Sequence, residues 1–225
     1  MLIIDRKNIF LVSIFFILIG IFLRFYQLNF ENYWFDELID FWVADPNISL
    51  NATFLRRELI DDQTPYLFQL LLKIYLKFFG YDPEGGRYVP LFFGALSIPF
   101  VGILSYQVAK NNSFLLTILL VSINIYLIKY SQETRTYTLV FFLSTINLIF
   151  YYKIISSNLI DIKRIYIFSL FVIFSVLSLS SHPFVFIIFF SQIAYSVYSF
   201  FVFRNKNVLF LLSIPFTLII YLIIN

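Results

Sequence analysis

Long apolar runs with almost no charge decide what this chain can fold into. A helix that crosses the hydrocarbon core of a membrane needs roughly 17–25 mostly apolar residues. Seven stretches of the sequence are long and apolar enough: 8–25, 88–109, 114–130, 136–152, 165–181, 184–203 and 208–224. Charged residues make up only 13% of the chain, against about 25% in soluble domains, so they are too few to cover a globular surface in water. The sequence therefore predicts an all-α polytopic membrane protein with about seven transmembrane helices.

The two ends of the sequence leave alternatives open. Arg6 and Lys7 precede the first apolar stretch, as in a signal peptide, but no small-x-small cleavage site follows it, so we expect an uncleaved first span. The last stretch runs to Ile224, and the sequence stops at Asn225 without a polar flank. This ending is more typical of a piece of a longer polytopic protein than of a complete seven-span protein. We therefore expect residues 1–225 to form a single transmembrane domain that is incomplete.

The basic residues predict which loops face the cytoplasm, because Lys and Arg gather in short cytoplasmic loops. With the N-terminus inside, the inner segments hold eight basic residues and only two acids, Asp5 and Asp161. The basic residues are Arg6, Lys7, Lys110, Lys153, Lys163, Arg164, Arg204 and Lys206. The short loop from Lys129 to Arg135 is the exception, since it lies on the outer side. We expect a multi-pass protein of a bacterial or archaeal plasma (inner) membrane with a cytoplasmic N-terminus.

This orientation places one long loop, residues 26–87, on the outer face between the first two spans. Loops longer than roughly a dozen residues usually carry function. Within the loop, Gln69, Lys73 and Lys77 recur every four residues in the apolar segment 65–80, which puts a polar stripe on one helical face. We expect a helix that lies in the membrane interface. The alternative is an eighth span, but two lysines near its middle would be costly, and every later loop would change sides.

Three carboxylates, Asp36, Glu37 and Asp40, lie among aromatic residues in NYWFDELIDFW at 32–42. Crowding by tryptophan and phenylalanine at the membrane surface partly desolvates a carboxylate and makes it a stronger base. Asp36 is thus a candidate general base that takes the proton of an acceptor hydroxyl, and in a helix Asp40 would share its face. The alternative is a solvated acidic loop beside an aromatic belt, which the local pattern taken alone slightly favours.

Further charged residues of the outer face could bind a substrate. They are Asp62 in DDQTPY (61–66), Glu84 and Arg87 in DPEGGRYVP (82–90), and Lys129, Glu133 and Arg135 in KYSQETRTY (129–137). Arg135 in particular could hold a phosphate through two hydrogen bonds. The alternatives are a helix start, a turn with a local ion pair, and basic side chains that extend to the lipid headgroups. A single histidine, His182, and the absence of Cys predict no metal site.

The order of these segments resembles a known family. The first span is followed by the Asp-Glu pair at 36–37, then by DDQTPYLFQLLLKIYLKFFG (61–80), EGGRYVPLFFGALSIP (84–99) and SQETRTYTL (131–139). This order is similar to the N-terminal half of the polyprenyl-phosphate-sugar-dependent glycosyltransferases of the GT-C fold. That group includes the protein O-mannosyltransferases, the lipid A aminoarabinose transferases and their bacterial relatives. The similarity covers about residues 8–150.

The resemblance implies a donor sugar linked to an isoprenoid phosphate and an acceptor hydroxyl on a protein, lipid or glycan. It implies inversion at the sugar, Asp36 as the catalytic base with Glu37 beside it, and no cofactor, metal or nucleic acid. Residues that would bind the substrates are Arg135, Arg87, Lys73, Glu133 and Asp62. The chain departs from the family at Gln63-Thr64-Pro65, where His-Pro-Pro or Lys-Pro is common, which puts phosphate contacts there in doubt. Family members are also substantially longer.

Two other hypotheses stay open. The chain could be a non-catalytic polytopic membrane protein, such as a transporter or a scaffold subunit, or an inactive truncated relative of the transferases. A transporter should place ionisable residues within its spans. The interiors of the predicted spans carry mainly Asn124, Asn147, serines and threonines, which argues against ion-coupled transport.

Overall fold

The computed structural model describes residues 6–60, 65–109, 111–156 and 161–204, and these residues form helices without any strand among them. The helices are α1 (Arg6–Phe25), α2 (Phe35–Val43), α3 (Leu50–Leu59), α4 (Leu67–Phe79), α5 (Pro83–Gly86), α6 (Tyr88–Ala109), α7 (Asn111–Ile123), α8 (Ile125–Ser131), α9 (Tyr137–Ser156), α10 (Asp161–Leu179) and α11 (Val185–Phe203). The predicted all-α class is confirmed.

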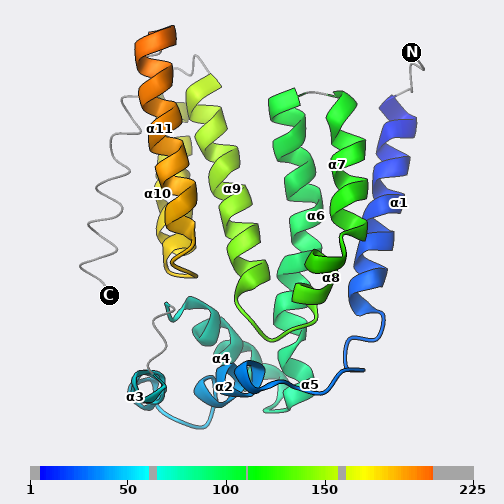
Figure 1. Ribbon diagram of the computed structural model, residues 1–225, viewed down its shortest axis with the longest axis vertical. Coiled ribbons are helices and arrows are strands. Elements are labelled where there is room, and N and C mark those ends of the chain that lie inside the picture. The colour runs from blue at the N-terminus through cyan, green and yellow to red at the C-terminus, as the bar shows by residue number, and fades with distance from the viewer. Residues whose placement is uncertain (1–5, 61–64, 110, 157–160, 205–225) are drawn as a thin grey trace.

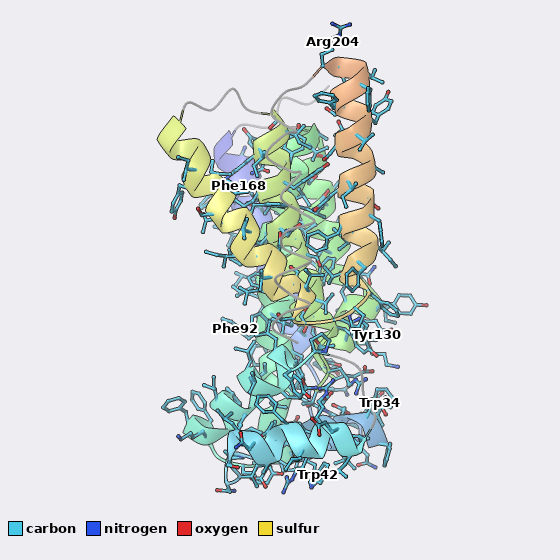
Figure 2. The ribbon with its side chains drawn as sticks, turned by 90° about the vertical axis from the view of Figure 1, so that its left-hand side faces the viewer. Trp34, Trp42, Phe92, Tyr130, Phe168 and Arg204 are labelled. Carbon is cyan, nitrogen blue, oxygen red and sulfur yellow. The ribbon has the colours of Figure 1, made fainter. Side chains whose placement is uncertain are left out.

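The helices form a bundle with a cap at one end (Figure 1). The long helices α1, α6, α7, α9, α10 and α11 run alongside one another, and α2 to α5, which we call the cap, lie across one end of them. The cap holds both tryptophans, while Arg204 lies at the opposite end (Figure 2). The start of α1 and the end of α9 lie at that opposite end too.

Several described helices are long and apolar enough to cross a membrane. They are Asn8–Phe25, Pro83–Ala109, Tyr137–Ser156 and Val185–Phe203. Large apolar side chains on these helices face outward, as on α11, where Ile187, Phe190 and Phe201 are each about two-thirds exposed or more. An apolar surface of this extent is what lipid covers. The chain is therefore an integral membrane protein.

Two predicted spans differ in detail from a straight helix of full length. The stretch 114–130 is divided into α7 and α8, which meet at a 55° bend. The apolar described part of α10, Ile165–Leu179, is shorter than the other spans. The predicted stretch 208–224 lies outside the described residues.

Helix α4 corresponds to the predicted interfacial segment, and its 13 residues are fewer than the roughly 17–25 that cross a membrane. Phe68, Leu72 and Leu76 are fully buried and belong to a core shared with α6 and α9. The expected polar stripe exists but is largely covered by the rest of the cap. Gln69 is buried, and Lys73 donates hydrogen bonds to carbonyl oxygens of the α2–α3 connection.

Helices α1, α7 and α8 cap one another where the α7–α8 bend leaves backbone carbonyls unpaired. The buried guanidinium of Arg24 on α1 donates to the carbonyl oxygens of Ser122 and Val121 at 3.3 and 3.1 Å. In return, Gln132, the C-terminal cap of α8, donates to the carbonyl oxygens of Arg24 and Tyr26 at 3.1 and 2.8 Å. These contacts satisfy carbonyls that helix ends leave unpaired, and they fix the segment that follows α8.

Candidate functional site

The most deeply buried charged pair of the described chain joins the cap to the bundle. Nε and Nη2 of Arg87 donate to the two carboxylate oxygens of Glu37 at 3.1 and 2.9 Å. Both side chains are at most 3% exposed. The backbone N–H of Thr134 donates to the same carboxylate at 2.6 Å. Glu37 thus ties α2 to the start of α6 and to the segment between α8 and α9.

The remaining donors of Arg87 are also engaged. Nη1 donates to the carbonyl oxygens of Leu28 and Glu31 at 3.0 and 2.9 Å, and Nη2 reaches that of Asn32 at 3.4 Å. The ring of Tyr33 covers the guanidinium at 4.2 Å, and burial raises the pKa of Tyr33 to about 12. Every nitrogen of Arg87 is therefore used inside the protein, which gives it the contacts of a structural clamp.

Arg135 has a different environment beside the predicted base. Its Nη1 donates to the side chain of Asp40 at 3.2 Å, whereas its Nη2 lies 3.7 Å from a carboxylate oxygen of Asp36. The second distance is too long for a hydrogen bond. The rings of Trp34 and Tyr137 flank the guanidinium at 5.8 and 5.7 Å. The side chain is 15% exposed, so it is not completely enclosed.

The surroundings of Arg135 stabilise its charged form. Burial alone would favour the neutral form, but Asp40, Tyr137 and Asp36 outweigh it and raise the pKa of Arg135. Its Nε is buried and has no hydrogen-bond partner among the described atoms. The Nη2 atom lies too far from Asp36 for a hydrogen bond and the side chain is partly exposed, so, unlike the fully paired Arg87, Arg135 is suited to bind an anion.

Asp36 is the most accessible of the three carboxylates on α2. Its side chain is 39% exposed, compared with 4% for Asp40. Within the described part of the chain, its carboxylate contacts a charged partner only at the 3.7 Å distance to Arg135. A carboxylate with a free oxygen near the surface can accept a proton from a substrate.

A cavity of about 770 Å³ adjoins this cluster, between the α1–α2 connection and the α8–α9 segment. Its aromatic lining is Tyr26, Phe30, Trp34, Tyr130 and Tyr137, and its charged lining is Glu31, Glu37, Arg87, Lys129 and Glu133. Figure 2 shows Trp34 and Tyr130 on the same side of the molecule, near the junction of cap and bundle. Asp36 and Arg135 are not part of the lining. Trp34 and Tyr137, which flank Arg135, also line the cavity.

Glu133 contributes a mostly buried carboxylate to this cavity. Its side chain is 13% exposed, and its nearest cation, Lys129, lies 3.7 Å away and is 63% exposed. Burial raises the pKa of Glu133, and the nearby carboxylates of Glu37 and Glu31 add to the effect, while Lys129 opposes it. The cavity therefore has an acidic wall.

The other predicted site residues lie apart from Asp36. Lys73 bonds the carbonyl oxygens of Asp45 and Ile48, and burial lowers its pKa. Asp62 lies outside the described residues. His182 accepts a hydrogen bond from the backbone N–H of Phe184 at 3.1 Å. No group of three potential metal ligands occurs in the part of the chain that the structure describes.

Two residues of the site carry no assigned role from the sequence. The sequence assigns Asp40 no function and places Gln69 only in a polar stripe, yet Gln69 donates a hydrogen bond to Asp40 and both are buried. The available signal was that a carboxylate four residues after Asp36 shares its helical face. Its partner lies 29 positions away, which no local pattern reveals.

Comparison of the chain with protein-family models, curated proteins and solved structures found no match.

Proposed function

We propose that this chain belongs to a membrane glycosyltransferase that moves a sugar from a polyprenyl-phosphate-linked donor to an acceptor hydroxyl, with inversion. The observation that carries the proposal is the placement of Asp36 next to Arg135 at the capped end of the bundle. One is an accessible carboxylate and the other a partly exposed arginine side chain. A proton acceptor and an anion-binding group at one place are what this transfer requires.

The proposed reaction is a single displacement. A carboxylate oxygen of Asp36 removes the proton of the acceptor hydroxyl, and the acceptor oxygen forms a bond to the anomeric carbon of the sugar. The bond from that carbon to the phosphate oxygen breaks, and its electron pair leaves with the lipid phosphate. Attack from the face opposite the phosphate inverts the anomeric carbon. Arg135 stabilises the negative charge that builds up on the leaving phosphate.

This geometry requires the substrates to enter between the two groups. In-line attack places the base and the phosphate on opposite faces of the reacting carbon, so Asp36 and Arg135 must be farther apart than 3.7 Å in the loaded site. Nη1 of Arg135 donates to the backbone carbonyl of Asp36 at 3.4 Å, but no hydrogen bond joins the two side chains, so the carboxylate can turn away. Arg135 can therefore stay with its other partner while Asp36 moves to the acceptor.

Arg135 is the best supported of the proposed phosphate ligands. The donors of Arg87 are all used by Glu37 and by loop carbonyls, and Lys73 is held by two carbonyl oxygens. Binding phosphate through either residue would first break these bonds. Glu37 then supports the site by holding α2 in place and does not take part in the proton transfer.

The acidic cavity fits the acceptor or the sugar better than the phosphate. Three carboxylates line it, and of its two cations Arg87 is fully paired and Lys129 lies beside Glu133. Such a lining offers no unpaired cation to an anionic group, whereas aromatic rings and carboxyl groups bind hydroxyl-rich or cationic groups. We assign Glu133 to this part of the substrate site.

The proposal includes the finer topology expected from the sequence. Seven spans, a cytoplasmic N-terminus and a cap on the outer face would place Asp36 where a lipid-borne donor arrives from the bilayer. The exposed apolar residues Ile74 and Phe78 on α4 support a position of the cap at the lipid surface. The membrane would be a bacterial or archaeal plasma (inner) membrane.

Binding of the leaving group tests the proposal without knowledge of the sugar or the acceptor. In a Trp42→Phe variant, Trp34 is the single tryptophan, and it lies 5.8 Å from the Arg135 guanidinium. Titration of this variant in nanodiscs with a polyprenyl monophosphate should change the Trp34 fluorescence in a saturable way. Adding Arg135→Gln should abolish the change.

The matched control is Arg56→Gln, because Arg56 stacks over Trp42 and not over Trp34. This control should bind the lipid phosphate normally. A protein that shows no saturable response, or a response that survives Arg135→Gln, would overturn the proposed donor site.

A further inference from the structure

Asp40 takes no part in the reaction above, yet it is the most completely surrounded carboxylate next to it. Its side chain is 4% exposed. Gln69 on α4 donates a hydrogen bond to one of its oxygens, and Nη1 of Arg135 donates to the other at 3.2 Å. A buried, doubly bonded carboxylate is fixed in both position and charge.

Asp36 and Asp40 compete for one guanidinium. The two residues are four positions apart on α2 and therefore share a helical face. Arg135 forms its hydrogen bond with the buried Asp40 and stays 3.7 Å from the more exposed Asp36. Solvent screens the exposed contact more than the buried one, which explains the preference for Asp40.

A general base needs a carboxylate oxygen that is free to receive the proton, and a neighbouring arginine can occupy that oxygen with a hydrogen bond. A charge-assisted hydrogen bond from a guanidinium to a carboxylate is among the strongest in proteins, and it would occupy the oxygen that has to receive the proton. Something must therefore hold Arg135 away from Asp36 while keeping it close enough to meet the phosphate.

We propose that Asp40, fixed by Gln69, is a positioning residue that anchors Arg135 and thereby leaves the carboxylate of Asp36 free to act as a base. This inference rests on the proposed function for its catalytic meaning, although the competition between the two carboxylates is a property of the protein alone. It also gives Arg135 a fixed partner when Asp36 turns toward the acceptor.

Gln69 holds Asp40 from a buried position on α4, in the core of the cap. Its side chain is 3% exposed on a helix whose neighbouring residues Phe68 and Leu72 are fully buried. The amide nitrogen reaches Asp40, and the amide oxygen has no hydrogen-bond partner among the described atoms. Loss of this amide would free Asp40 to rotate without changing any charge at the site.

The test measures how readily Asp36 reacts with a hydrophobic carbodiimide, which attacks protonated carboxyl groups. Modification of the Asp36 peptide in the reconstituted protein is quantified by mass spectrometry at one fixed pH. In Asp40→Asn, Arg135 should form a charge-assisted hydrogen bond with Asp36 and lower its modification by about tenfold, the factor that corresponds to one such bond. Gln69→Leu should act in the same direction with a smaller effect.

A double-mutant cycle separates anchoring from simple repulsion between the two carboxylates. In an Arg135→Gln background, Asp40→Asn should lower the modification of Asp36 much less, because only the loss of repulsion between the two carboxylates remains. An effect of equal size in the two backgrounds, or no effect in the presence of Arg135, overturns the inference. If Asp40→Asn fails to fold, Gln69→Leu decides, and unchanged modification of Asp36 in that variant overturns it.

Asp45→Asn is the matched control, since Asp45 pairs with Arg56 elsewhere in the cap and should leave Asp36 unchanged. The labelling needs no substrate, so its outcome is independent of the proposed function. If Asp40→Asn changes the labelling of Asp36 but the wild type transfers no sugar, the proposed transferase activity is refuted and the role of Asp40 is not. If the wild type transfers sugar but Asp40→Asn leaves the labelling of Asp36 unchanged, the role of Asp40 is refuted and the transferase activity is not.

Discussion

At the scale of single residues, the three carboxylates of α2 have three different environments. Glu37 is fully buried and paired with Arg87, Asp40 is buried and shared between Gln69 and Arg135, and Asp36 is partly exposed. These differences follow from the helical positions of the residues. The face that carries Glu37 and Phe41 turns toward the core, whereas Asp36 lies at its edge.

Removing one partner of the buried pair should be severe. Glu37→Gln leaves the charge of Arg87 uncompensated in the interior, and we expect a loss of about 3–5 kcal/mol in the free energy of unfolding. Thermal unfolding in detergent measures the change. Glu31→Gln, at an exposed position, should have little effect. A wild-type melting temperature for Glu37→Gln would show that the pair does not hold the cap.

Glu133 predicts a pH dependence of stability. Its raised pKa means that the folded chain binds the proton more tightly than the unfolded chain. The free energy of unfolding should therefore fall as pH rises from 4.5, the ordinary value, through the raised pKa. Glu133→Gln lacks this titration, so its stability relative to the wild type should increase across the same window. A difference that does not change with pH, or that has the opposite slope, contradicts the assignment.

At the scale of the helices, the sequence predicts where apolar helices occur but not how they bend. The stretch 114–130 was predicted as one span, and the structure divides it at Asn124, whose side chain accepts a hydrogen bond from the N–H of Leu127 at 3.0 Å. Asparagine is a favoured N-cap residue, so a local signal existed. The break also depends on Arg24, nearly a hundred positions earlier, and this contact has no local signature.

The capping of α8 depends on close packing against α6. A Cβ atom on Gly94 would lie 2.0 Å from the Oγ and 2.8 Å from the Cβ of Ser131, so α8 would have to move. Gly94→Ala should lower the free energy of unfolding by about 1–3 kcal/mol. Gly85→Ala is the control, since the nearest atom to its added Cβ, on Tyr75, is 3.8 Å away. Equal melting temperatures for the two variants would contradict this packing.

In the candidate site too, local sequence patterns predict some of the residues but not the contacts between distant positions. Asp36, Glu37 and Arg135 were predicted as its members from the sequence, and the structure brings them within one cluster. The pairing of Glu37 with Arg87 joins residues 50 positions apart. That pairing depends on the tertiary fold. It changes the role expected for Arg87 from binding phosphate to holding the cap in place.

At the scale of the whole molecule, the bundle has two distinct ends. The cap lies at one end, and the start of α1, the end of α9 and Arg204 lie at the other (Figures 1 and 2). The predicted sidedness would place these two ends on opposite faces of the membrane. Which end faces the cytoplasm stays a prediction from the positive charges.

The absence of Cys makes this orientation simple to measure. A cysteine introduced at Asn47, in the cap, should react with a membrane-impermeant maleimide in intact cells. One introduced at Ser156, at the end of α9, should react only after the cells are opened. Labelling of the Ser156 position in intact cells would reverse the predicted orientation and place Asp36 on the inner face.

The central claim is that Asp36 is the base of a sugar transfer from a lipid phosphate. The most direct measurement is the release of polyprenyl monophosphate from a panel of polyprenyl-phosphate-linked sugars by membranes that contain the full chain and their own acceptors. The wild type should release it, and Asp36→Asn should release it about 10²–10⁴-fold more slowly while still binding the lipid phosphate. Undiminished release by Asp36→Asn would contradict the account.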